Sequence, residues 1–145
     1  MYNYILNSVR SITLEIAKLQ GLASQMAKSN DYERKHQYEE FIKWCKNEKE
    51  NLLENYCPER IIENLYLSDD EKIMARSYYL YGKSWEEAFY ETDEFLNIDG
   101  DELDDAVTKK IKKICRTHQR NIERKVGVFY AFNKRESCPK ETTNR

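Results

Sequence analysis

Apolar side chains recur at alternating steps of four and three residues through the first part of the chain. The positions in this series are Ile5, Val9, Ile12, Ile16, Leu19, Ala23 and Met26. Such heptad spacing predicts an amphipathic helix whose apolar stripe packs against another helix. The polar run Ser29-Asn30-Asp31 interrupts the series, and either Asn30 or Asp31 can cap the helix that follows.

A second helical pattern follows this break. Its inward positions are Tyr38, Ile42 with Phe41, Cys45, Lys49, Leu52 with Leu53, and Tyr56, and Pro58 then stops the helix. Residues 1–57 are therefore predicted to form an antiparallel helical hairpin. Two arrangements remain open: the hairpin packs only against its own chain, or residues 1–57 form the arm of a dimeric coiled coil and make the protein a homodimer.

Two capping boxes, Ser68-x-x-Glu71 and Ser84-x-x-Glu87, follow a short connector at 59–67. In each box the serine oxygen accepts from the N3 amide while the glutamate reaches back to the cap amide, so each box starts a helix. We expect one helix over 69–81, ended by Gly82, and one over 85–96. Inward-facing side chains expected on these helices include Met74, Tyr78, Tyr81, Trp85, Phe89 and Leu96.

A third helix is expected over about 102–124, after a turn at 97–101. One of its faces is apolar, with Leu103, Val107, Ile111, Ile114, His118 and Ile122. The opposite face carries a basic stripe made of Lys109, Lys112, Lys113, Arg116, Arg120 and Arg124. A basic helix after a short helix and turn is the arrangement by which helix-turn-helix proteins enter the major groove, so this stripe is the predicted binding site for double-stranded DNA. The alternative is a solvated face whose charges complement the helix dipole.

Composition supports an all-α fold. The chain has 145 residues, of which 40% are hydrophobic and 34% charged, with only 4 Gly and 2 Pro. These turn-formers are too few for a sandwich of short strands or for glycine-rich phosphate loops. The length favours one compact domain or two small subdomains. We divide the chain into a hairpin at 1–60, a three-helix unit with a helix-turn-helix at 66–126, and a C-terminal tail at 127–145 that docks on the core and then frays.

Charge is strongly polarised along the chain, although the net charge is only -2. Residues 66–105 hold 3 basic and 13 acidic side chains, and residues 106–145 hold 12 basic and 3 acidic ones. This block structure leaves a second hypothesis open, in which the acidic stretch 86–105 binds a basic surface of a host or mobile-element protein. The acidic candidates for that contact are Glu91, Asp93, Glu94, Asp99, Asp101, Glu102, Asp104 and Asp105.

The segment from Leu67 to Ala88 resembles the region-4-like helix-turn-helix of sigma factors, in particular small phage-encoded activators of the ArpU and RinA type. The resemblance lies in the acidic start Leu67-Ser68-Asp69-Asp70-Glu71 and in the later run Gly82-Lys83-Ser84-Trp85-Glu86-Glu87. The sequence of residues 107–114 is similar to the recognition helix of those families. The resemblance implies a phage or mobile-element transcriptional regulator that acts in the cytoplasm of a bacterial host, with DNA and RNA polymerase or another host protein as partners.

Other chemistry is weakly represented in the sequence. Asn97, Asp99 and Gly100 match part of a calcium loop, but Phe95 and Ala106 occupy two of its ligand positions. The four cysteines at 45, 57, 115 and 138 contain no C-x-x-C pair and are expected to be reduced thiols. We therefore expect no metal, no cofactor and no enzymatic activity. No stretch has the roughly 20 apolar residues of a membrane span, so we expect no membrane partner.

Overall fold

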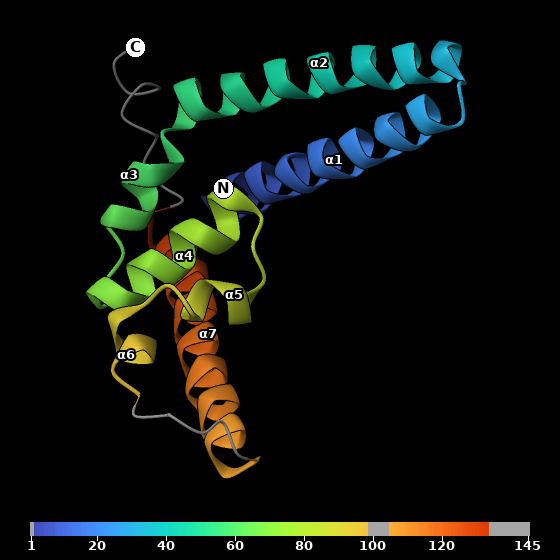
Figure 1. Cartoon of the computed structure of the whole chain (residues 1–145). Helices are drawn as coiled ribbons and strands as arrows, with labels where there is room; N and C mark the ends of the chain where they lie inside the picture. Colours follow the sequence, from blue (N-terminus) through green and yellow to red (C-terminus); the bar gives the residue numbers. More distant parts are fainter. Residues whose placement is uncertain (1, 99–104, 134–145) are drawn as a thin grey trace, which may run out of the picture.

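The computed structural model is entirely helical across the residues it describes (Figure 1). It describes the backbone of residues 2–98 and 105–133, and the side chains of 4–98 and 105–127. The helices are α1 (Tyr2–Lys28), α2 (Tyr32–Tyr56), α3 (Pro58–Glu63), α4 (Asp69–Tyr81), α5 (Trp85–Phe89), α6 (Asp93–Leu96) and α7 (Asp105–Asn133). The predicted all-α class, with a long hairpin followed by shorter helices, is confirmed.

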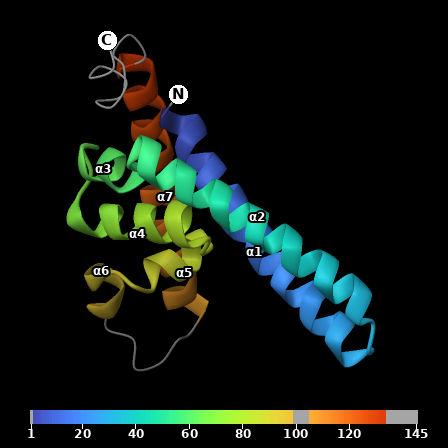
Figure 2. The ribbon, with the colours of Figure 1, turned by 90° about the horizontal axis from the view of Figure 1, so that it is seen from above.

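Helices α1 and α2 pack side by side as an antiparallel hairpin (Figure 1). Asp31 caps α2, because its side chain accepts a hydrogen bond from the backbone N–H of Arg34 at 3.3 Å. Asn30 has a left-handed φ of 59°, which closes the turn. Helices α3 to α7 lie together in a group that we call the head. Seen from above, the tip of the hairpin projects well beyond the head (Figure 2).

The buried side chains form two separate clusters. The arm cluster lies between α1 and α2 and consists of Ile16, Leu19, Ile42 and Cys45. The head cluster is larger and takes its side chains from α1, α3, α4, α5 and α7 as well as the loops between them. Leu6, which the heptad series omits, is fully buried in the head, because the first turns of α1 pack against α4 and α7 as well as α2.

Both predicted capping boxes are present. The Ser68 oxygen accepts from the Glu71 N–H at 3.2 Å, and the Ser84 oxygen accepts from the Glu87 N–H at 3.1 Å. Gly82 ends α4 with a left-handed φ of 74°. These local signals fix where α4 starts and stops and where α5 starts. Helices α4, α5 and α7 contact one another in the head.

The predicted end of the second helix before Pro58 is confirmed, since α2 ends at Tyr56. Three other expectations about element bounds are wrong. The connector expected over 59–67 is partly helical, because Pro58 begins α3, and proline suits the first turn of a helix, where no N–H partner is needed. The helix expected over 85–96 is two helices, since Thr92 caps a new helix by accepting from the Phe95 N–H. The third helix runs beyond Arg124 and through Gly127 to Asn133, so residues 127–133 continue α7 instead of beginning a tail.

Four side chains expected to face inward are exposed. Phe41 and Leu53 are exposed because the buried positions of α2 are Ile42 and Cys45, and Phe41 and Leu53 lie to either side of those positions. Tyr81 lies one heptad after the buried Met74 and on the same side of α4, but it is the last residue of the helix, beyond the part that packs in the head, and its side chain is exposed. Leu96 is exposed because the break at Thr92 resets the helical phase on which its burial was predicted.

Candidate nucleic-acid interface

One side of α7 is anchored in the head. Ile111, Cys115, Ile122 and Val126 are buried in the head cluster. The Cys115 Sγ lies 3.5 Å from the carbonyl oxygen of Trp85, at the start of α5. The Trp85 ring in turn stacks on Tyr78 of α4, with ring centroids 3.8 Å apart and an interplanar angle of 10°. The face of α7 that remains available to a ligand is therefore set by its packing against α4 and α5.

The opposite face of α7 is the predicted basic stripe, and all of its members are exposed. They are Lys109, Lys112, Lys113, Arg116, Arg120 and Arg124. Within the described part of the chain, none of these six side chains forms an ion pair with a carboxylate. Their charges are accordingly available to an external polyanion.

Five of the six cations line one hollow of about 490 Å³ along α7. They are Lys109, Lys112, Lys113, Arg116 and Arg120, and Thr117 completes the wall. Arg124 lies apart from this group, because it borders a different hollow with Glu71 and His118 and donates from Nη2 to Asn121 Oδ1 at 2.8 Å. Arg120 borders both hollows.

A carboxylate precedes the basic stripe at the start of α7. Asp105 is the first residue of α7 and lies one turn before Lys109 on the same side of the helix. An acidic side chain there favours the helix because it faces the positive end of the dipole. The same side chain repels phosphate, so a polyanion is best placed over the middle of the stripe, around Lys113 and Arg116.

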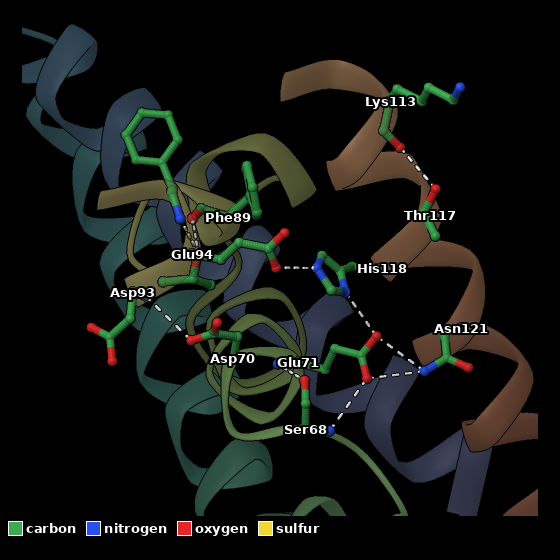
Figure 3. Close-up of polar contacts among 12 residues, drawn as sticks. Ser68, Asp70, Glu71, Phe89, Asp93, Glu94, Lys113, Thr117, His118 and Asn121 are labelled. Atoms are coloured by element: carbon green, nitrogen blue, oxygen red, sulfur yellow. Dashed lines mark hydrogen bonds and ion pairs between the residues drawn. The ribbon is translucent and has the colours of Figure 1, made fainter. Parts of the chain in front are cut away.

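A hydrogen-bonded network joins the flank of α7 to α4 and α6 (Figure 3). His118 Nδ1 lies 2.8 Å from Glu71 Oε2, and His118 Nε2 lies 2.7 Å from Glu94 Oε1. Asn121 Nδ2 donates to both Glu71 oxygens, at 2.9 and 3.0 Å. Glu71 also accepts from the Ser68 N–H in the capping box. One buried carboxylate thus connects the start of α4 with the middle of α7.

The network shifts the proton affinity of its members. Burial by itself would lower the pKa of His118, but the hydrogen bonds to Glu71 and Glu94 outweigh it and raise that pKa above its usual value. Burial would likewise raise the pKa of Glu71, yet hydrogen bonds from His118, Asn121 and Ser68 outweigh it and lower that pKa. Both shifts favour a charged imidazolium held between two carboxylates.

Part of the acidic stretch is engaged within the chain. Glu91 accepts from Ser77 Oγ and Lys83 Nζ, and these two contacts lower its pKa. Glu94 is held by His118, and the Asp93 N–H donates to Asp70 Oδ1 at 3.2 Å. The other acidic candidates at 99, 101, 102 and 104 lie outside the described residues. Asp105 is exposed at the start of α7.

Sequence reasoning placed His118 on the apolar face but missed its partners. Glu71 is recognisable in the sequence only as a capping residue, and nothing in the spacing indicates that it meets His118, which is 47 positions away. Thr117 was also missed as a wall of the basic hollow. Its position four residues after Lys113 is a usable signal, since residues one turn apart share a helix face.

The structure offers no metal-ligating group of three or more His, Cys, Asp or Glu side chains among the residues it describes. Cys45, Cys57 and Cys115 are free thiols, and Cys138 lies outside the described residues. Burial raises the pKa of the Cys45 and Cys115 thiols, which keeps them protonated at neutral pH.

Comparisons with protein-family models, with curated proteins and with solved structures give no match for this chain. A search of the described helices for one of sufficient length and apolar character to span a bilayer finds none.

Proposed function

We propose that the protein is a DNA-binding transcriptional regulator of a phage or mobile element, acting in the bacterial cytoplasm with RNA polymerase or another host protein as a partner. The observation that carries the proposal is the exposed cationic stripe on α7, directly opposite the face that packs into the head. The proposed role is one of binding, without a catalytic step. The resemblance of residues 67–88 to region-4-like helix-turn-helix segments supports the same reading.

The dimensions of the stripe suit duplex DNA. A helix rises about 1.5 Å per residue, so the cations from Lys109 to Arg124 extend over about 22 Å. The major groove is about 12 Å wide, so a helix lying in it can face base edges with its central side chains while both ends reach phosphates. The Asp105 carboxylate disfavours a contact through the first turn. We therefore place Lys113, Arg116 and Arg120 at the centre of the contact.

Fluorescence anisotropy of a mixed-sequence duplex, titrated at about 50 and 200 mM salt, tests the proposal. Binding should weaken steeply with salt, because each phosphate neutralised by a cation contributes a slope of about -0.9 to the plot of log K against log salt. The variant with Lys113, Arg116 and Arg120 all changed to Glu should bind far more weakly and with a shallower salt slope. Because all three sites are exposed on α7, we expect this variant to keep the fold. Its melting curve checks that expectation.

A matched control changes Lys18, Lys43 and Lys46 to Glu. These lysines are exposed on the hairpin, and the control alters the net charge of the protein by the same amount. Retained binding by the control, with loss in the α7 variant, supports the site. Equal loss in both variants, or no binding of the unmodified protein at about 50 mM salt, contradicts it. In that case the acidic segment 86–105 becomes the bait with which to seek a basic protein partner.

A further inference from the structure

The outer part of the hairpin has a small core of its own. The arm cluster has four buried side chains, and Ile12, Leu22 and Tyr38 are only partly buried against it. No other described helix lies over the tip of the arm (Figure 2). A pair of helices with so few buried side chains is marginally stable by itself in water, and helix pairs of this kind are usually completed by further helices.

An aromatic pair borders this cluster on α2. Phe41 and Trp44 keep 49% and 58% of their surface exposed, and their ring centroids are 5.7 Å apart. Trp44 lies about 180° around the helix from Leu53, at 100° per residue. Leu53 lines a cavity together with Leu80 and Tyr81 of the head. Trp44 therefore points away from the cavity side of α2, while Phe41 lies about 120° from Leu53 by the same measure, and both rings are exposed.

The charges beside the pair are arranged symmetrically about Phe41. Arg34 lies seven residues before Phe41 and Glu48 seven residues after it, which is one heptad in each direction along the same helix face. If two copies of α2 pair antiparallel with Phe41 at the centre, Arg34 of each copy meets Glu48 of the other.

Arg34 is exposed and can make this contact, whereas Glu48 is half-buried. The Arg34 side chain is 68% exposed and has one long ion pair, 3.7 Å from Nε to Asp31 Oδ2, at the tip of the arm. An exposed pair of this kind holds its partners weakly. Arg34 can therefore turn toward a carboxylate one heptad beyond Phe41.

We propose that this face of the hairpin binds a second copy of the chain, with the two α2 helices antiparallel about Phe41 and the two hairpins forming a four-helix bundle. The occupant is a second copy because a two-fold axis at Phe41 pairs each Arg34 with a Glu48. A partner surface with charges of a single sign would instead place a like charge opposite either Arg34 or Glu48. This inference is independent of the proposed DNA binding.

Sedimentation equilibrium of the full chain over a wide concentration range tests the proposal. The protein should be a dimer, and Arg34→Glu or Glu48→Arg should each weaken dimerisation by about tenfold or more, since each places two like-charge pairs in the interface. The double variant R34E/E48R restores the pairs in reverse and should recover most of the affinity. Phe41→Ser with Trp44→Ser should give a monomer with unchanged helical circular dichroism.

The matched control is Lys43→Glu, Glu50→Lys and their combination. Lys43 and Glu50 are also seven residues apart and of opposite charge, but they are exposed on the other side of α2. These variants should dimerise like the unmodified protein. A protein that is monomeric at all concentrations overturns the proposal. So does a dimer in which R34E/E48R binds no better than the single variants, because the register about Phe41 would then be wrong.

Discussion

His118 on α7 and Glu71 on α4 lie 2.8 Å apart, from Nδ1 to Oε2, with the carboxylate almost fully buried. Glu94 on α6 holds the other ring nitrogen, and Phe89 of α5 lies beside the ring, with centroids 6.1 Å apart. His118 therefore contacts α4, α5 and α6 as well as lying on α7. Its protonation state bears on how firmly α7 is held in the head.

The imidazole of His118 should titrate above the ordinary histidine pKa of about 6.5. The hydrogen bonds to Glu71 and Glu94 favour the charged ring and outweigh the effect of burial. A proton NMR titration of the ring resonances measures this pKa directly. The chain has 2 histidines, so His36→Gln assigns the two signals without touching the network. A value for His118 below 6.5 would show that the two contacts do not hold a charged ring in solution.

Replacing His118 with Gln should change the pH dependence of stability. A raised folded-state pKa stabilises the fold fully below about pH 6.5, and this contribution is lost as pH rises through the folded-state value. The lowered pKa of Glu71 acts in the opposite sense, since its contribution is present above its ordinary value and lost as pH falls. We expect His118→Gln to lower the free energy of unfolding by about 1.5 kcal/mol near pH 6, and by less near pH 9. Urea melts at the two pH values measure the difference, and an equal loss at both would argue for a packing effect alone.

Two glycines should respond to alanine with opposite signs. Gly82 has a φ of 74°, and a Cβ there would lie 3.1 Å from Thr13 Cγ2 and 3.3 Å from Leu14 Cδ2. Gly82→Ala should therefore destabilise the protein by about 1 kcal/mol or more. Gly21 lies inside α1, and a Cβ added there would meet nothing within 4 Å beyond the adjacent backbone of its own helix, so Gly21→Ala should stabilise by about 0.5–1 kcal/mol. Thermal melts of the two variants against the parent decide the point, and a common sign would contradict the assigned backbone geometry.

Arg10 should resist replacement by lysine. Its Nη1 donates to the carbonyl oxygens of Tyr78 and Lys83, at 2.5 and 2.7 Å, and its guanidinium lies 3.6 Å from the centre of the Tyr78 ring. The side chain thus binds the carbonyls at the end of α4 and joins the hairpin to the head. A lysine ammonium lacks the planar fork and the stacking surface, so Arg10→Lys should cost about 1–2 kcal/mol despite keeping the charge. Lys18→Arg, at an exposed site on the same helix, is the matched control and should be neutral in the same urea titration.

Local sequence signals determined most of the helices. The heptad series, the polar break before α2, the two serine capping boxes and Gly82 are each decided within a few residues, so they could be read without knowing the fold. The basic stripe of α7 was equally legible, since the 3.6-residue period of a helix places its cations on one side. The sequence missed elements where one residue carries two signals, as at Pro58, which was correctly expected to end one helix but also begins the next.

Tertiary structure alone decided which surfaces are buried and which polar groups meet. Arg10 and Lys83 are 73 positions apart, and His118 and Glu71 are 47 apart, so no short-range pattern could pair them. The tertiary structure also decided which partner each part of α1 buries: its first turns pack into the head cluster, while its later turns pack in the arm cluster with α2. Helix formation follows from contacts within a few residues, whereas these partnerships depend on how whole helices pack against one another.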